Sequence, residues 1–295
     1  MPQYGLRDYL QFLVSGASTG CIYVLIGLGL ITIYNVTGVV NLAQGEFVML
    51  GAMLAVVYHQ GLHLPLVMAF LVAVLSVMAI GALVQRLTIH PARHASEVTL
   101  IIITIGTAIA LRGLGLLAWG TTPQSLPEFS PGAPLVLWGA VLSRQRLWIM
   151  GTAAAVLVLL YLFFEFTLLG KAVRACAINR QVSQLVGINT EFMALLAYAL
   201  SAGMGAIAGI VIAPLTLVSY DMGLALGLKG FVVAIMGGLV NAPAAVIGGL
   251  LLGIFEQLAA GTLPSGFKDA LAFLVLFVVL LGRTVRVTEL FRRRS

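Results

Sequence analysis

The chain has 295 residues, of which 61% are hydrophobic and only 9% are charged, and its net charge is +6. The mean hydropathy is +1.09, and a soluble domain carries about 25% charged residues. The composition therefore excludes a soluble globular enzyme, a disordered chain and a nucleic-acid-binding module. A lipid bilayer is the solvent that suits this chain. Because hydrocarbon requires every backbone polar group to be bonded within its own segment, we expect an all-α integral membrane protein.

Long intervals without charged residues define the expected membrane spans. Residues 9–45, 47–85 and 192–220 contain no Lys, Arg, Asp or Glu, and a helix needs about 20 apolar residues to cross the hydrocarbon. The intervals predict a polytopic helical bundle of about eight or nine spans, within a single transmembrane domain over residues 1–295. The expected spans cover residues 10–34, 39–58, 64–85, 98–119, 147–168, 193–214, 226–241, 243–259 and 267–283.

Basic residues gather in the segments 86–97 and 169–191 and in the tail from residue 283 onward. Basic loops stay on the cytoplasmic side of a membrane, so we expect these three segments, and with them the C-terminus, to be cytoplasmic. Three expected spans precede the first basic segment, which places the N-terminus outside. The loop 120–146 then also lies outside, and its prolines favour irregular chain or a short surface helix.

Polar and small residues interrupt two of the expected spans. The break near residues 35–46 places polar residues and glycines between apolar helices, and the break near 237–249 combines glycines with a proline. Polar side chains at membrane depth face protein or a water-filled cavity, so one interpretation is a pair of broken or re-entrant helices that line a translocation path. The other is an ordinary interfacial turn, with Glu46 stabilised at a helix N-terminus. The candidate pathway residues are Asn35, Asn41, Gln44, Glu46, Asn241 and Pro243.

Pairs of glycines four residues apart recur along the chain, and they predict helices whose backbones approach closely. The pairs are Gly16 and Gly20, Gly205 and Gly209, and Gly249 and Gly253.

Several charged residues and two histidines lie at positions that favour a structural role over a functional one. Arg112 lies inside the fourth expected span, and we expect it to snorkel outward or to bond a neighbouring carbonyl. Glu256 lies inside the eighth, where a helix-packing role is expected. His90 and His94 are four residues apart, but Pro91 lies between them and no third ligand is near, so no metal site is expected.

The segment 169–191 is much longer than a connection between two spans needs to be, since about four residues suffice. It is amphipathic, and its pattern is typical of short helices that end at Gly187. One interpretation is a docking surface for a cytoplasmic partner. The other is an interfacial helix that rests on anionic lipid.

Three motifs, in order along nearly the whole chain, resemble those of one family. GVVNLAQGEFVMLG is similar to an early Asn-Phe-Ala-His-Gly-Glu motif, with Leu42 and Gln44 in place of the Phe and the His. GKAVRACAINRQVSQLVGIN resembles the family's cytoplasmic loop. AIMGGLVNAPAAVIGGLLLGIFE resembles its Gly-Gly-Ile-Gly-Ser-Ile-Pro-Gly-Ala motif, with Val240, Asn241 and Ala242 where the family has Gly, Ser and Ile or Leu. The chain thus resembles the branched-chain amino acid ABC transporter permeases of the LivH type.

The resemblance implies a non-catalytic permease subunit of an ATP-driven importer in the bacterial inner membrane. Its partners would be a second permease subunit of the LivM type, two cytoplasmic ABC ATPases and a periplasmic substrate-binding protein. ATP hydrolysis would take place on the partners, which agrees with the lack of a GxxxxGK[ST] loop in this sequence. The resemblance also implies that 169–191 is the coupling loop to the ATPases. Its candidate residues are Gly170, Lys171, Arg174, Ala175, Arg180, Gly187, Ile188 and Asn189.

The expected substrates are branched-chain amino acids, or related small amino acids, amides or carboxylates, delivered by the binding protein. Gln44 and Asn241 depart from the family pattern and leave the substrate open. Two alternatives are a ribose-type sugar permease with the same ABC arrangement and an ion-coupled secondary carrier that works alone. A membrane enzyme would need a convergent set of titratable groups, which the sequence does not show, and no cofactor is expected.

Overall fold

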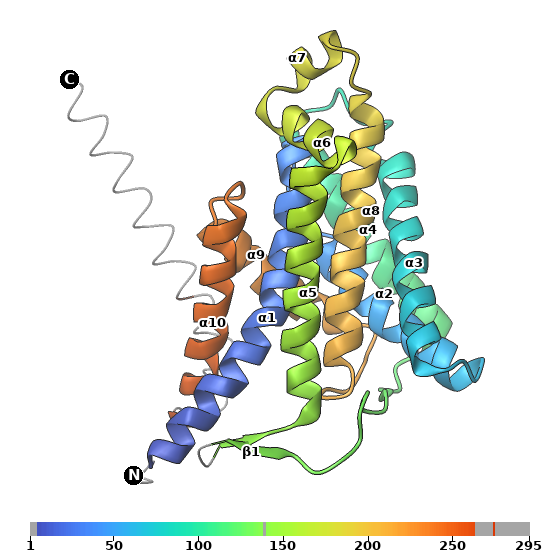
Figure 1. The fold of residues 1–295 in the computed structure, drawn as a ribbon. Helices are drawn as coiled ribbons and strands as arrows, with labels where there is room; N and C mark the ends of the chain where they lie inside the picture. The colour runs from blue at the N-terminus through green and yellow to red at the C-terminus, as the bar shows by residue number, and fades with distance from the viewer. Residues whose placement is uncertain (1–4, 138–139, 263–273, 275–295) are drawn as a thin grey trace, which may run out of the picture.

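The computed structural model describes residues 5–137, 140–262 and 274 of the chain. Most of these residues are helical, and the long helices run side by side between two ends of the molecule (Figure 1). The elements, in chain order, are α1 (Leu6–Thr37), α2 (Gln44–Val56), a π-helical turn (Val57–Gly61), α3 (Leu66–Val84), a second π-helical turn (Gln85–Ile89), α4 (Glu97–Trp119), β1 (Leu135–Leu137), β2 (Ala140–Leu142), α5 (Arg144–Phe166), α6 (Leu168–Ile178), α7 (Arg180–Leu185), α8 (Thr190–Ile212), α9 (Met222–Met236) and α10 (Ala242–Thr262).

Six of the described helices are long and apolar enough to cross a membrane: α1, α3 with the π-helical turn that follows it, α4, α5, α8 and α10. This is the all-α, multi-pass architecture that the sequence predicts. The interrupted spans expected at 39–58 and 226–241 form two shorter helices: α2 has 13 residues and continues into the π-helical turn, and α9 has 15. Within the described residues the span count stays below the expected eight or nine, and the expected span 267–283 lies outside them apart from Leu274.

The two ends of the bundle carry different structures (Figure 1). α6 and α7 cover one end, which we call the α6–α7 end. The N-terminus of α1 and the β1–β2 hairpin lie at the opposite end, which we call the hairpin end. The connection from α3 to α4 also lies at the α6–α7 end, so the basic segments 86–97 and 169–191 come together there, as their charge pattern predicts.

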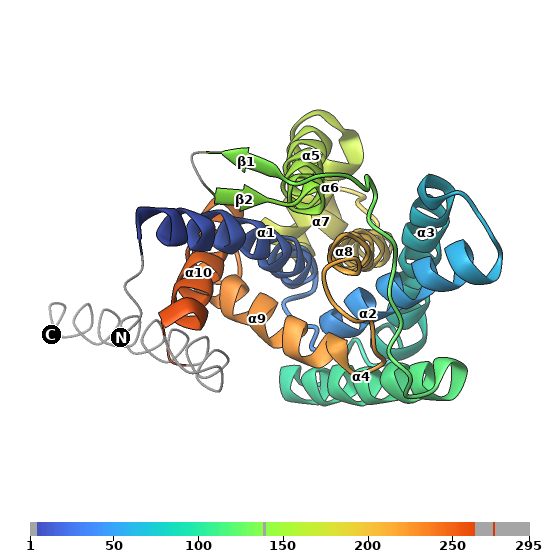
Figure 2. The same cartoon turned by 90° about the horizontal axis from the view of Figure 1, so that it is seen from below.

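The core lies around α1, α2 and α8. Viewed along the bundle, these helices are surrounded by α3, α4, α5, α9 and α10 (Figure 2). Every residue of α2 except Leu54 is buried, so this short helix is enclosed by protein. The apolar core of α1, with Leu25 and Ile26 fully buried, packs against Val233 of α9 and Leu252 of α10.

The glycine pairs lie where helices cross, which confirms the close contacts predicted from their spacing. A Cβ atom on Gly253 of α10 would overlap the backbone of Gly20 on α1. A Cβ atom on Gly209 of α8 would overlap the carbonyl of Val48 on α2. These helices therefore pack backbone against backbone, which larger residues would prevent.

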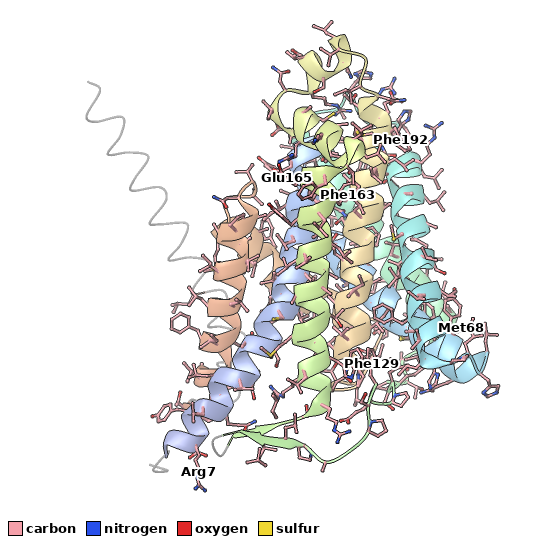
Figure 3. The ribbon with its side chains drawn as sticks, viewed as in Figure 1. Arg7, Met68, Phe129, Phe163, Glu165 and Phe192 are labelled. Carbon is pink, nitrogen blue, oxygen red and sulfur yellow. The ribbon has the colours of Figure 1, made fainter. Side chains whose placement is uncertain are left out.

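The loop between α4 and α5 forms a hairpin, where the sequence favours irregular chain or a short helix. Its strands β1 and β2 are antiparallel, and each has only three residues, too few for a periodic pattern. The Gln11 side chain of α1 holds the hairpin, because it donates to the Val141 carbonyl at 2.9 Å and accepts the Val141 N–H at 2.7 Å. Phe129 (Figure 3) packs against Phe70 and Trp148, with ring centroids 6.3 and 6.0 Å apart.

The crossing of α2 and α8 predicts a difference between two glycine substitutions. Gly209→Ala should lower the midpoint of thermal unfolding, because overpacking costs about 1–3 kcal/mol. Gly106→Ala on α4 should not lower it, because apart from its own turn of helix no atom of the described residues lies within 4 Å of the position its Cβ would take. Thermal unfolding of the purified chain in detergent measures both. Equal midpoints for the two variants would contradict the close contact of α2 with α8.

Candidate functional site

The break between α1 and α2 lies inside the bundle, and protein groups satisfy its backbone. Gly38 ends α1 with a φ of 72°, in the left-handed region that glycine tolerates. The Asn41 Oδ1 atom accepts the Ala43 N–H at 3.1 Å. The Leu42 N–H donates to the Thr104 hydroxyl of α4 at 3.3 Å. Side chains thus replace the helical hydrogen bonds that the break removes.

Hydrogen bonds join the start of α2 to α8 and α1. Gln44 Nε2 donates to the Ser201 carbonyl at 3.0 Å, and the Ser201 hydroxyl donates to Gln44 Oε1 at 2.6 Å. The same hydroxyl lies 2.8 Å from the Gly29 carbonyl. Both side chains are buried. Because both ends of the amide are bonded, Gln44 is fixed in one orientation between three helices.

Glu46 and Arg112 form a buried ion pair in the first turn of α2. Arg112 Nη2 of α4 donates to Glu46 Oε1, and the Glu46 side chain is 2% exposed while that of Arg112 is 25% exposed. The N-terminal end of the helix dipole adds to the stabilisation of the carboxylate. The prediction that Arg112 snorkels outward or bonds a carbonyl is wrong, because a carboxylate from another helix lies within its reach.

These residues line a cavity of 180 Å³ among α1, α2, α4 and α9. Asn41, Gln44, Glu46 and Arg112 form its polar wall, and most of the other lining side chains are apolar, Phe231 among them. Three buried atoms of the polar wall have no hydrogen-bond partner among the described residues: Asn41 Nδ2, Arg112 Nε and Glu46 Oε2. The cavity thus combines two free donors and one free acceptor with apolar walls.

Three glycines let α9 begin beside the ion pair. A Cβ atom on Gly45 would overlap the Gly223 carbonyl and lie 2.9 Å from Gly227 Cα. A Cβ atom on Gly223 would lie 2.9 Å from Glu46 Oε2. The wall that α9 contributes to the cavity therefore depends on the absence of side chains at these positions.

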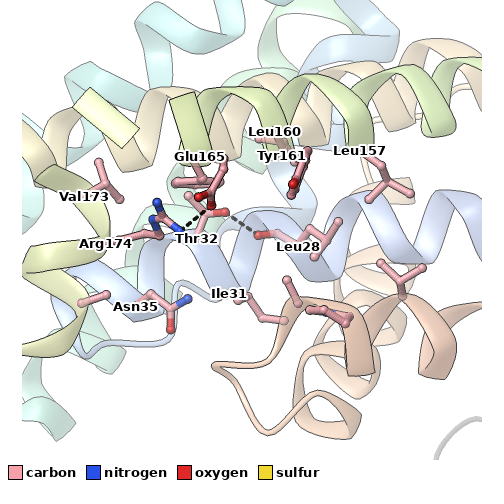
Figure 4. Close-up of a pocket in the computed structure, with 15 residues that line it drawn as sticks. Leu28, Ile31, Thr32, Asn35, Leu157, Leu160, Tyr161, Glu165, Val173 and Arg174 are labelled. Carbon is pink, nitrogen blue, oxygen red and sulfur yellow. Dashed lines mark hydrogen bonds and ion pairs between the residues drawn. The ribbon is translucent and has the colours of Figure 1, made fainter. Parts of the chain in front are cut away.

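Asn35 and Pro243 lie away from the ion pair. They line a second cavity, of 480 Å³, between α1, α5, α6 and α10 (Figure 4). Its walls are mainly apolar. At its α6–α7 end, an Arg174 guanidinium N–H donates to Glu165 Oε2 at 2.8 Å, and both side chains are about half exposed.

The second break, residues 237–241, ends α9 and precedes α10. Gly238 and Leu239 have φ values of 68° and 64°, outside the helical region. Asn241 is exposed and accepts the Ala244 N–H at 3.0 Å, which caps α10. The six candidate pathway residues therefore separate: Asn41, Gln44 and Glu46 share one cavity, Asn35 and Pro243 share another, and Asn241 lines neither.

The segment expected to couple to ATPases folds as two short helices with side-chain caps. Asn179 Oδ1 accepts the Val182 N–H at 3.0 Å at the start of α7, and Asn189 caps α8. Gly170 packs on the backbone of α5, and Gly187 has a φ of 86° that makes the turn before α8. Lys171 and Arg174 are exposed, whereas Ala175, Arg180 and Ile188 are half-buried.

The α6–α7 surface also carries apolar side chains that the sequence did not single out. Ile178 is 88% exposed and Leu185 is 86% exposed. Cys176 faces the bundle instead, and burial raises the pKa of its thiol. The outer face of α6 and α7 is thus apolar and basic, while the inner face packs on the helices below.

Two polar clusters join helices that are distant in the sequence. At the α6–α7 end, Glu191 of α8 lies 2.9 Å from His90 Nε2 and also pairs with Arg93. Between α9 and α10, Lys229 Nζ lies 2.8 Å from Glu256 Oε1. Glu256 is fully buried, in keeping with a packing role. No sequence spacing pointed to these pairs, because their partners lie on different helices.

Known proteins that match this chain are transport permeases. The family described as branched-chain amino acid transport system, permease component, matches residues 12–280. The chain is 30% identical to the high-affinity branched-chain amino acid transport system permease protein BraD of Pseudomonas aeruginosa, over 96% of each chain. It is 31% identical to the permease protein LivH of the same kind of system in Escherichia coli, over 92% of this chain and 93% of that one.

A solved structure has a similar fold. PsaBC from Streptococcus pneumoniae, in complex with a Fab, aligns with a TM-score of 0.50 at 14% sequence identity, over 92% of this chain and 90% of that one. At this identity the likeness concerns the fold alone. The family match and the two permeases, by contrast, extend over nearly the whole sequence. The chain therefore belongs to the branched-chain amino acid permease family of ABC transporters, and is a multi-pass inner-membrane protein.

Proposed function

We propose that the chain is the membrane-spanning subunit of an ATP-driven importer for branched-chain amino acids, or for related small amino acids, amides or carboxylates. The observation that supports this most directly is the polar break 38–43 and the Glu46–Arg112 pair, deep inside the bundle of a chain from this family. Ionised groups are costly within a membrane, and they mark solute pathways. In this proposal Asn41, Gln44 and Glu46 form part of the pathway wall.

The orientation follows from the basic segments. Residues 86–97 and 169–191 lie at the α6–α7 end, which we assign to the cytoplasm because basic loops remain there. The C-terminus is assigned to the same side. The hairpin end then faces the periplasm, where a substrate-binding protein delivers the solute. A second permease subunit of the LivM type completes the path through the membrane.

Two cytoplasmic ABC ATPases dock on α6 and α7 in this proposal. Exposed apolar side chains such as Ile178 and Leu185 suit an interface, and Lys171 and Arg174 add positive charge beside them. Gly170 packs against α5, and Asn189 caps α8. Movement of the ATPases would therefore reach two membrane-crossing helices directly, and those helices would open the path to each side in turn.

Affinity purification of the tagged chain from its native membranes, followed by mass spectrometry, tests the proposed assembly. We expect two P-loop ATPases and a second permease to copurify, because this chain needs them for ATP-driven transport. A chain recovered alone that still transports in liposomes, driven by an ion gradient without ATP, would contradict the proposal and identify a secondary carrier.

The docking surface itself is tested by acidic substitutions. The double variant Ile178→Glu and Leu185→Glu should reduce copurified ATPase by roughly tenfold or more, because each buried apolar side chain contributes about 1.5–3 kcal/mol. Val136→Glu is the matched control, since Val136 is 66% exposed but lies in β1 at the hairpin end. Mass spectrometry of the purified complexes measures the ratio of ATPase to permease. Undiminished ATPase in the double variant would place the docking surface elsewhere.

A further inference from the structure

The cavity beside the Glu46–Arg112 pair presents hydrogen-bonding atoms that the described part of the chain leaves unsatisfied. These atoms are the donors Asn41 Nδ2 and Arg112 Nε and the acceptor Glu46 Oε2. Asn41 is 0% exposed and Glu46 is 1% exposed. A buried polar group without a partner costs about 1–3 kcal/mol, and a charged one costs more. Three such atoms around one cavity indicate a site for a ligand with complementary groups.

We infer that this cavity binds one zwitterionic amino acid with an apolar side chain. Its ammonium group donates to Glu46 Oε2, and its carboxylate accepts hydrogen bonds from Arg112 Nε and Asn41 Nδ2. The inference rests on the proposed function and deepens it, because it assigns a substrate class to a site within the permease itself. It also gives Arg112 a binding role in addition to its pairing with Glu46.

The balance of charge favours a zwitterion over a ligand with a single charge. The Glu46–Arg112 pair is neutral as a unit, and a zwitterion adds no net charge to the interior of the membrane, where net charge is costly. A carboxylate without an ammonium group leaves Glu46 Oε2 unpaired. An amine without a carboxylate leaves both donors unpaired. A ligand with both groups meets all three atoms. A zwitterion does so through charge-assisted hydrogen bonds, which are stronger than those of a neutral amide.

The walls of the cavity favour an amino acid over a sugar. Its volume of 180 Å³ leaves room for one compact solute. Ile105, Ile109 and Phe231 supply apolar contacts for a side chain. A sugar would bring several hydroxyl groups, and most of these would find no partner among the described residues.

The open side of the cavity lies between α4 and α9. Ile109 of α4 and Leu224 of α9 line the cavity and are 65% and 51% exposed. A polar solute needs a path walled by protein or water through the membrane, so the inference places this face of the chain against the second permease subunit and the path between the two subunits.

Equilibrium binding of radiolabelled L-leucine tests the inference. The sample is the purified transporter complex in lipid nanodiscs, without ATP and without the binding protein. The competitors are 4-methylpentanoate, which lacks the ammonium group, and 3-methylbutylamine, which lacks the carboxylate. Both keep the apolar skeleton of leucine. We expect leucine to bind, and each competitor to bind at least about tenfold more weakly because it leaves buried groups unpaired.

Variants locate the binding to these side chains. The double variant Glu46→Gln and Arg112→Gln removes both charges together, so it leaves no lone charge buried, and leucine binding should fall by at least about tenfold. Thr107→Val is the matched control, because Thr107 lies on α4 but lines a different cavity. Its leucine binding should be unchanged. If the double variant does not fold, the competitors still decide the question on the unaltered complex.

Three outcomes would overturn the site: no binding of leucine, equal competition by the two analogues, or unchanged binding in the folded double variant. The proposed function is tested separately, by whether the ATPases copurify in the same preparation. A complex that contains the ATPases but does not bind leucine in this way overturns the binding site alone.

Discussion

The structure depends on one constraint, which is that backbone groups in the break 38–43 must find hydrogen-bond partners where a membrane offers no water. Thr104 supplies one partner from α4, and Asn41 supplies another within the break. Gln44 and Ser201 then tie the start of α2 to α8 and α1. A non-helical segment is stable at this depth because neighbouring helices enclose it.

The same constraint explains the shape of the centre and the place of the polar cavity. α2 is short because it begins inside the bundle, and it is buried along its length because lipid could not face its polar start. The glycines at 45, 209 and 223 allow α8 and α9 to close around it. This enclosure brings Glu46 to Arg112 and leaves a small polar wall in an otherwise apolar core. A transport pathway needs a polar wall, because the groups of the wall replace the hydrogen bonds to water that a polar solute loses when it enters.

Features that are local in the sequence were predicted well, and features that depend on contacts between helices were not. Charge-free intervals predicted the long helices, and three motifs predicted the family. The Glu46–Arg112 pair joins residues 66 positions apart on different helices, so no spacing revealed it. Asn241 and Pro243 were grouped with the residues of the first break because polar and small residues interrupt both spans, but Pro243 lines a different cavity and Asn241 lines neither.

A double-mutant cycle on Glu46 and Arg112 tests most directly whether these side chains form a buried pair that stabilises the enclosed start of α2. Breaking a buried ion pair by removing one partner costs about 3–5 kcal/mol, because the other charge stays uncompensated. Glu46→Gln and Arg112→Gln should therefore each lower the midpoint of thermal unfolding in detergent. The double variant should lower it by less than the sum of the two single losses. If the losses simply add, the two side chains do not stabilise each other, and the account of a buried ion pair at the start of α2 is contradicted.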